Sequence, residues 1–289
     1  MSDDAGLPPA ARERLERLRE AGGPAFTSAL SVGETLTVRQ AGLRPLSQVM
    51  GTSYYKIGWQ QMPWGSGRSG WFAQGRDGET QELSNQTDAY NEARRLAVGR
   101  LREEAIAVGA DAVVGVHVRR TLRDWSTDLV EFVAIGTAVR SERYDLGPEP
   151  LLCNLSGQDV AKLVSHGFWP VGIVGGSTVA YVVTGTRQQR STTSFFGSGL
   201  SNQELPDYTQ GLYDARALAM ERVTRGAHEL HAHGVVGVDV ERDMKPYERE
   251  VNNVSYRDLI ITMHILGTAI VEMQDGPPPP EKYIALPLT

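Results

Sequence analysis

The sequence predicts an α+β fold made of two tandem repeats, each a small antiparallel-type sheet with one long helix on one face. An internal duplication, two amphipathic helical stretches and a valine-rich strand after each of them support this prediction. Apolar residues at steps of three and four indicate a helix with one buried face, and β-branched runs bounded by turn residues indicate strands. Each repeat is therefore expected to run strand, loop, helix, strand, strand.

The duplication is visible in two gap-free stretches of 26 residues that are identical at 12 positions. Similar segments lie upstream and downstream of this stretch, in the same order. The matching pairs are 42–45 with 167–170, 93–118 with 215–240, and 135–139 with 266–270. Three anchors in one order indicate a tandem repeat.

These anchors divide the chain into five parts. An N-terminal amphipathic helix is expected within residues 1–25, the first repeat spans 26–144, and the second repeat spans 151–273. The linker 145–150 and the tail 274–289 are rich in proline, which opposes both helix and central strand.

Both long helices are expected to bury a single apolar stripe. The first stripe consists of Ala89, Ala93, Leu96, Ala97, Leu101, Ala105 and Val108. The second stripe consists of Tyr208, Leu212, Ala215, Ala219, Val223, Ala227 and Leu230. Gly109 follows the first helix where a left-handed C-cap belongs, and Asp207 with Gln210 has capping-box character at the start of the second.

Strands are expected where β-branched and aromatic residues gather. Residues 171–183 indicate a buried strand that bends at Gly175 and Gly176. Residues 113–118 and 235–240 are the valine-rich strands, and a last strand follows each of them after a hairpin.

The N-terminal residues 9–21 have the pattern of a charge-laced amphipathic helix. Its apolar stripe is narrow and contains Leu15 and Leu18. Such a stripe fits docking either on the protein's own assembly or on a partner.

Residues 109–116 and 136–139, after a helix with an Ala-Arg step, resemble the YbjQ-like family, which is also described as heavy-metal-binding. Members of this family usually carry one copy, whereas this chain resembles two fused copies. The resemblance implies a small α/β subunit that assembles into a pentameric ring in single-copy relatives. It implies no established reaction.

Two repeats in one chain change how a ring can close. Chains that each contribute two repeats cannot close a ring with an odd number of repeats. Five chains in two stacked layers, one layer for each repeat type, is the favoured arrangement. Three chains forming a pseudo-hexamer is the alternative.

Composition excludes several classes of protein. The net charge of −6 and the acidic balance argue against nucleic acid as a partner, because phosphate contacts need clustered Lys and Arg. No apolar run approaches the length of a transmembrane segment. A single cysteine, Cys153, forms no internal disulfide and fits a cytoplasmic protein.

A glycine-rich loop at Gly67, Arg68, Ser69 and Gly70 is a candidate anion-binding nest, in which backbone N–H groups and one guanidinium would hold the ligand. A flexible loop tip is the simpler interpretation. An enzyme acting on an anionic substrate at Arg68 is a third hypothesis. The sequence contains no Walker A motif, no Gly-x-Ser-x-Gly elbow and no His-Glu-x-x-His motif, so it predicts a protein that is not an enzyme.

His228, His231 and His233 are the candidate ligands for a divalent transition metal such as zinc, nickel or copper. A spacing of three residues on a helix brings two imidazoles to one face. The first repeat has Ile106, Gly109 and Asp111 at these positions, so the alternative is that the histidines are exposed at a helix end, where the dipole favours them.

Aromatic and apolar residues in the loops and the tail are candidate partner contacts, because rigid side chains on loops suit protein interfaces. Packing on their own subunit is the alternative. They are Trp59, Trp64, Trp71, Phe72, Phe195, Phe196, Tyr283, Ile284 and Leu286.

The sequence therefore predicts a non-enzymatic, ring-forming assembly or interaction protein. Its expected partners are further copies of itself and an unidentified protein. The alternative function is a metal- or small-ligand-binding protein that uses His228, His231 and His233 or a cavity between the repeats.

Overall fold

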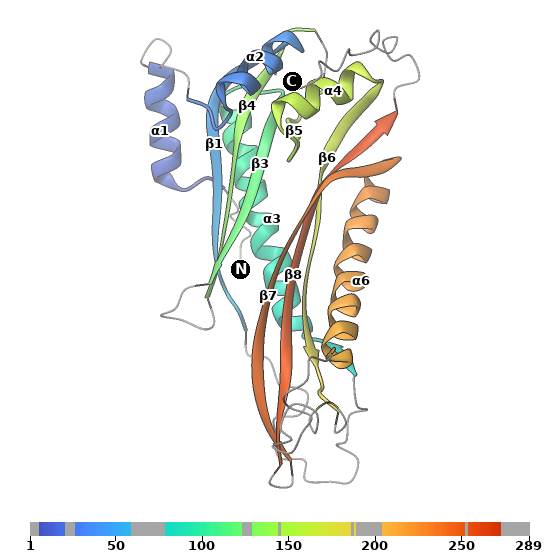
Figure 1. Cartoon of the computed structure of the whole chain (residues 1–289). Coiled ribbons are helices and arrows are strands. Elements are labelled where there is room, and N and C mark those ends of the chain that lie inside the picture. The colour runs from blue at the N-terminus through green and yellow to red at the C-terminus, as the bar shows by residue number, and fades with distance from the viewer. Residues whose placement is uncertain are drawn as a thin grey trace, which may run out of the picture.

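The computed structural model describes residues 6–20, 27–58, 79–122, 129–143, 146–185, 188, 204–251 and 254–272. Two four-stranded sheets lie side by side, and each is packed against a long helix (Figure 1). The strand orders are β1-β4-β3-β5 and β2-β6-β8-β7. The predicted α+β class with two repeats is confirmed in this coarse form.

The elements follow the predicted order in each repeat. The N-terminal helix α1 (Pro9–Glu20) precedes the first repeat. The elements of the first repeat are α2 (Val32–Gln40), β1 (Leu43–Lys56), β2 (Thr80–Glu82), α3 (Ser84–Ala107), β3 (Ala112–Leu122) and β4 (Leu129–Ser141). In the second they are β5 (Leu151–Leu152), α4 (Gly157–Ser165), β6 (Phe168–Val182), α6 (Pro206–Glu229), β7 (Gly234–Val251) and β8 (Val254–Glu272). The short helices α2 and α4 and the short strands β2 and β5 were not predicted.

The duplication is repeated in the geometry of the backbone. Both long helices contain 24 residues. The register of the first strand shifts after Pro45 in β1 and after Pro170 in β6. The valine-rich strands shift after Val114 and Val236. Positions of the two repeats can therefore be equated, element by element, without gaps.

The ends of the helices follow the same duplication. Gly109 has a φ of +71° just after α3, which confirms the predicted C-cap. His231 holds the equivalent position after α6 with a φ of +51°, a conformation uncommon for a side chain other than glycine.

The predicted capping box of α6 is wrong. The helix begins at Pro206, so Asp207 lies inside its first turn and Leu205, which makes no side-chain cap, is the N-cap residue. Proline is favoured at this first position because its missing N–H would have no partner there. The Asp207 carboxylate accepts instead from the Gly185 N–H at 2.9 Å.

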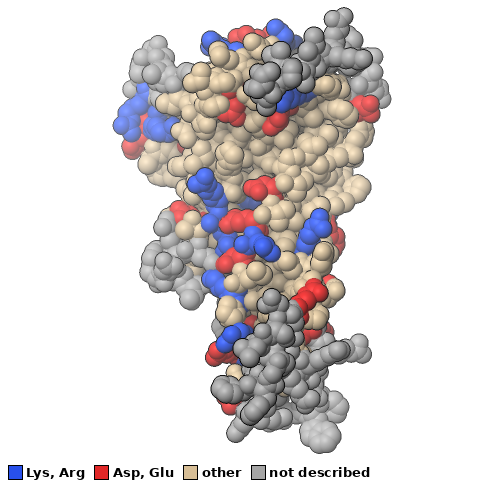
Figure 2. Space-filling model, viewed as in Figure 1, with Lys and Arg blue, Asp and Glu red and all other residues tan. Residues whose placement is uncertain are grey.

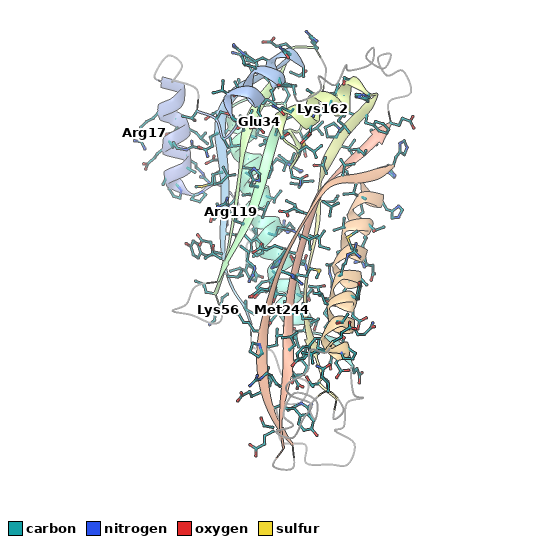
Figure 3. The ribbon with its side chains drawn as sticks, in the orientation of Figure 1. Arg17, Glu34, Lys56, Arg119, Lys162 and Met244 are labelled. Carbon is teal, nitrogen blue, oxygen red and sulfur yellow. The ribbon has the colours of Figure 1, made fainter. Side chains whose placement is uncertain are left out.

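Charge is distributed unevenly over the face seen in Figure 1. Side chains of both signs intermix across its middle, and a broad band above them carries few charges (Figure 2). Among the labelled side chains, Arg119 and Met244 lie in this middle region, on the neighbouring strands β3 and β7 (Figure 3). In the part of the chain that the structure describes, no helix is both long and apolar enough to span a membrane.

Two equivalent glycines allow each long helix to approach its first strand closely. A Cβ added at Gly51 would overlap the Ala97 carbonyl oxygen, and one added at Gly176 would overlap the Ala219 carbonyl oxygen. We expect Gly51→Ala to lower the free energy of unfolding by about 1–3 kcal/mol, because the added methyl group would force the backbone of α3 away from β1.

Gly99→Ala is the matched control, because a Cβ at Gly99 meets no atom within 4 Å. It should raise the free energy of unfolding by about 0.5–1 kcal/mol, since alanine is the better helix former. Urea denaturation of both variants measures the difference. Equal stabilities for the two would contradict the close approach.

Candidate assembly interface

The two repeats meet where side chains of α3 close the outer edge of β6. The Thr87 hydroxyl accepts from the Val179 N–H at 2.9 Å. Asn91 accepts from the Ser177 N–H at 2.9 Å and donates to the Ser177 carbonyl at 3.0 Å. Arg94 donates to the Gly175 carbonyl at 2.7 Å. These bonds satisfy backbone groups that an edge strand would otherwise expose.

A short strand and one carboxylate extend this contact. β2 pairs antiparallel with the end of β6, so a strand of the first repeat completes the sheet of the second. Glu82 then forms an ion pair with Arg222 of α6 at 2.9 Å and accepts from the Thr178 hydroxyl at 3.1 Å. Glu82 thus fixes the chain entering α3 to both β6 and α6.

Residues 151–155, at the start of the second repeat, bind in turn to the sheet of the first repeat. The N–H groups of Gly115 and Val116 in β3 donate to the carbonyls of Leu155 and Cys153, each at 2.9 Å. The Asn154 N–H donates to Thr268 of β8 at 3.0 Å. Cys153 is buried, and this burial raises the pKa of its thiol to about 11.

The centre of the junction is a buried, mostly aromatic cluster around His264. Its Nδ1 atom lies 2.8 Å from the Ser177 hydroxyl, and its ring packs on Tyr90 and Phe132 with centroids at 5.4 and 5.5 Å. Burial, and then the positive charges of Arg120 and Arg94, hold the pKa of His264 well below its usual value. His264 therefore stays neutral in the folded protein.

Arg120 connects the cluster to β7. Its guanidinium lies 3.8 Å from a carboxylate oxygen of Asp243 and 4.0 Å from one of Glu241. An open groove of about 430 Å³ runs beside it between β3 and β7. This groove lies between the repeats, and its described lining holds charges of both signs.

A buried carboxylate elsewhere in the second repeat is fully engaged. Asp258 pairs with Arg249 at 2.5 Å, accepts from the Thr184 N–H at 2.8 Å and accepts from the Tyr181 hydroxyl. Burial, followed by the hydrogen bond to Asp258, raises the pKa of Tyr181. These three donors hold the Asp258 carboxylate in place within the fold.

Each repeat also has an outer face that is equivalent to a surface used in the contact between the repeats. We call these the two end faces, and nothing in the described structure covers them fully. Tyr54 of β1 is equivalent to Val179 of β6, but it is 53% exposed whereas Val179 is fully buried. Val238 of β7 is equivalent to Val116 of β3, but it is 44% exposed whereas Val116 is 1% exposed. The first repeat therefore presents a β6-like face, and the second presents an α3- and β3-like face.

The predicted metal ligands do not converge. The helix ends at Glu229, so His231 lies outside it in the left-handed conformation and the spacing of one helical turn from His228 is not kept. His233 uses Nδ1 to accept from the Glu272 N–H at 3.0 Å. Among the described residues, no group of three or more His, Cys, Asp or Glu side chains is placed to hold a metal ion.

The remaining predicted sites lie outside the described residues and stay predictions. They are the loop Gly67, Arg68, Ser69 and Gly70, and the aromatic and tail residues Trp59, Trp64, Trp71, Phe72, Phe195, Phe196, Tyr283, Ile284 and Leu286. The residues of the junction were missed by sequence reasoning. One signal was available: Gln81-Glu82-Leu83 recurs as Gln203-Glu204-Leu205 just before each long helix.

Comparison with known proteins finds similarity along the whole chain. The model of the family YbjQ_1, described as "Putative heavy-metal-binding", matches residues 72–142 and 169–272. A protein of Mycobacterium tuberculosis named "Encapsulin nanocompartment protein" is 36% identical over 280 residues, which cover 94% of each chain.

Shorter relatives match only part of the chain. A "UPF0145 protein" of Lactiplantibacillus plantarum is 43% identical over 65 residues, which are 22% of this chain and 55% of that protein. One of Enterococcus faecalis is 41% identical over 59 residues, 20% of this chain and 54% of that protein.

The neutral His264 predicts a pH-dependent stability. As the pH falls through about 6.5, the unfolded chain binds a proton at this histidine before the folded chain does, because the pKa of His264 is lowered in the folded chain. The free energy of unfolding should therefore fall as the pH decreases, by at most about 1.4 kcal/mol per pH unit. His264→Gln should reduce this slope in urea titrations between pH 5 and pH 8.

His228→Gln is the control, because His228 is exposed on α6 and should leave the slope as it is in the natural chain. A slope that survives in His264→Gln would show that another group controls the acid sensitivity of the fold.

Proposed function

We propose that this chain, which belongs to the YbjQ family, is a non-enzymatic subunit that assembles with further copies of itself. In the assembly, the second repeat of one copy docks on the first repeat of the next. The contact between copies repeats the contact that joins the two repeats within one chain.

The observation that carries this proposal is the position of the exposed apolar residues. Ten large apolar side chains are exposed in the described part of the chain, and eight of them lie on elements of the two end faces. Those of the first repeat are Val32 and Leu36 on α2 and Met50 and Tyr54 on β1. Those of the second repeat are Tyr213 on α6 and Val238, Val240 and Met244 on β7. Apolar surface gathered in this way marks an interaction site.

The α2 contact illustrates how the faces would match. Within the chain, Gly157 at the start of α4 packs so closely on Val38 of α2 that a Cβ would overlap the valine. Val32 is equivalent to Gly157 and is the most exposed of the large apolar residues. In a second copy, Val32 would lie against α4 of its neighbour and be removed from water.

A contact between two different faces generates a closed ring or an open filament. The contact within a chain and the contact between chains would be equivalent and would follow one another around the ring. First and second repeats would therefore alternate along it. This order does not fit five chains in two stacked layers, each of one repeat type. We therefore propose three chains in a ring of six repeats, which was the alternative arrangement.

The relative named as an encapsulin nanocompartment protein supports an assembly role, because its similarity extends over nearly the whole of both chains. The engaged state of Asp258 and the burial of Cys153 support a role without catalysis, since both groups serve the packing of the fold.

Native mass spectrometry of the untagged protein tests the proposal, because one spectrum counts subunits and weighs any bound ligand. Tyr213→Asp and Val238→Asp should each shift the population from the oligomer to the monomer, with at least a tenfold weaker association, because a charge would be placed in the contact.

Ile106→Asp is the matched control. Ile106 is 52% exposed, and it lies one helical turn after Arg102, which contacts Glu149 of the linker rather than an end face. This variant should assemble like the natural chain. A natural chain that stays monomeric at micromolar concentration would contradict the proposal, and excess mass of a metal would favour the alternative function.

A further inference from the structure

We infer that the outer edge of β1 is the docking site for the first half of α6 from a second copy, and that α1 occupies this site in the isolated chain. The inference rests on the proposed self-assembly and goes beyond it, because it assigns α1 the role of a displaceable cap that opposes assembly.

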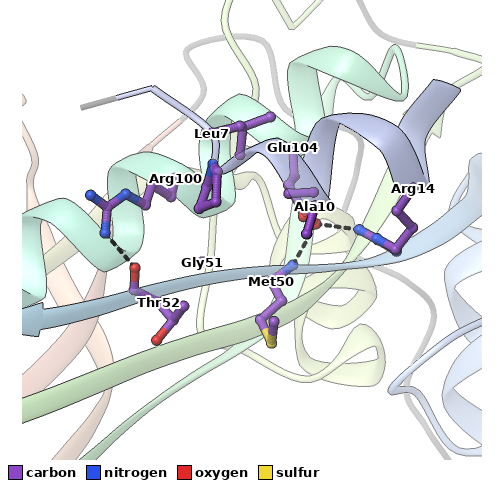
Figure 4. Close-up of a pocket in the computed structure, with 10 residues that line it drawn as sticks. Leu7, Ala10, Arg14, Met50, Gly51, Thr52, Arg100 and Glu104 are labelled. Carbon is purple, nitrogen blue, oxygen red and sulfur yellow. Dashed lines mark hydrogen bonds and ion pairs between the residues drawn. The ribbon is translucent and has the colours of Figure 1, made fainter. Parts of the chain in front are cut away.

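The contact of α1 with the body of the molecule centres on one buried carboxylate. Glu104 of α3 pairs with Arg14 of α1 at 2.6 Å and accepts from the Met50 N–H of β1 at 2.9 Å. Leu15 supplies the apolar part of the contact and is 5% exposed. Figure 4 shows the Arg14 side chain and the backbone N–H of Met50 both joined to Glu104.

The fit beneath α1 is incomplete. A cleft of about 290 Å³ remains between α1, β1 and α3, and its lining includes Ala10, Gly51, Thr52 and Arg100 (Figure 4). In Figure 1, α1 lies alone beyond the outer edge of β1. Among the side chains of α1 that the structure describes, Arg14 forms the ion pair and Leu15 is the buried apolar residue. A helix with so few buried contacts, lying over a cleft, is held weakly compared with the strands of the sheet.

The equivalent place in the second repeat is already filled, which identifies what belongs there. Met50, Thr52 and Arg100 are equivalent to Gly175, Ser177 and Arg222. Within the chain, Gly175 and Ser177 bond to Arg94 and Asn91 of α3, and Arg222 pairs with Glu82. The first half of α3 therefore covers the second repeat at the place where α1 covers the first repeat.

The first half of α6 carries the groups needed to repeat this contact. Glu204, Thr209 and Arg216 are equivalent to Glu82, Thr87 and Arg94, so all three residue types are retained. Glu204 and Arg216 are exposed in the isolated chain. Tyr213 replaces Asn91 and adds an aromatic ring to the contact.

The receiving edge holds polar atoms that lack the partner found in the second repeat. The Ser53 hydroxyl, at the position of Thr178, is 1% exposed, and it finds no hydrogen-bond partner among the described residues. Arg100 Nε, at the position of Arg222, also finds none there. Buried polar atoms are normally bonded, and a carboxylate equivalent to Glu82 would accept from both. Glu204 of a second copy is that carboxylate.

Removal of α1 need not leave a buried charge without a partner. Arg14 would withdraw from Glu104, but Arg216 of the incoming helix would arrive at the edge of Met50, whose N–H already bonds to Glu104. One arginine would thus replace another at the same carboxylate. The exchange avoids the cost of an unpaired buried charge.

Reciprocal charge substitutions test the docking site. Glu204→Arg and Arg100→Glu should each weaken association at least tenfold in sedimentation equilibrium, and the two substitutions together should restore most of it. Arg100 is partly buried in the site, so Arg100→Glu could disturb folding. Glu204 is exposed, so Glu204→Arg should fold and provides the test by itself in that case. Association unchanged in Glu204→Arg, or no recovery when a folded Arg100→Glu is combined with it, would overturn the docking site.

Leu15→Asp in the full chain tests the cap. This substitution should loosen α1, because burial of the leucine holds the helix in place. With the docking site uncovered, the protein concentration at which half of the chains are assembled should fall roughly tenfold. Arg17→Ala is the control on the exposed side of α1, where Arg17 donates to the Glu13 carbonyl of its own helix. Unchanged or weaker assembly of Leu15→Asp would overturn the role of α1 while leaving self-assembly intact. A monomeric natural chain would instead overturn the proposed function.

Discussion

The closure of one strand edge by the side chains of one helix determines how this molecule is built. The outer edge of β6 presents backbone groups that need partners, and Thr87, Asn91 and Arg94 supply them from one face of α3. Spacings of four and three residues place these side chains on successive turns. Because α3 also packs on β1 and β4, a single helix holds both sheets together. The relative position of the repeats depends on this helix together with β2 and residues 151–155.

Duplication gave the chain two copies of each contact surface, and only one of each pair is used within the chain. The internal contact contains ion pairs that the other contact would lack, since Arg120 lies between Glu241 and Asp243. At the equivalent positions for a second copy, Arg242 would face Arg119 and Thr121. We therefore expect the internal contact to form first and to be the stronger one. A weaker contact between copies is suited to regulation by a cap such as α1.

The sequence predicted the duplicated framework, but it did not predict the residues that join the two repeats. Periodicity located both long helices, and Gly109 marked the end of the first. The three histidines were predicted as metal ligands because of their residue type. In the structure, His231 follows the end of α6 in the left-handed conformation, and His233 accepts a hydrogen bond from a backbone N–H. The residues that join the repeats are common polar types such as Thr87 and Asn91. Their role depends on which strand edge they face, and a single sequence does not contain that information.

The sequence by itself determined the α+β class, the two repeats and the positions of their long helices and strands, because local periodicity and an ordered duplication are properties of the chain alone. Only the tertiary structure decided that α3 closes the edge of β6, that Glu82 pairs with Arg222, and that α1 lies on β1. These contacts join residues far apart in the chain. They form because strand edges and buried charges must find partners wherever the fold brings them.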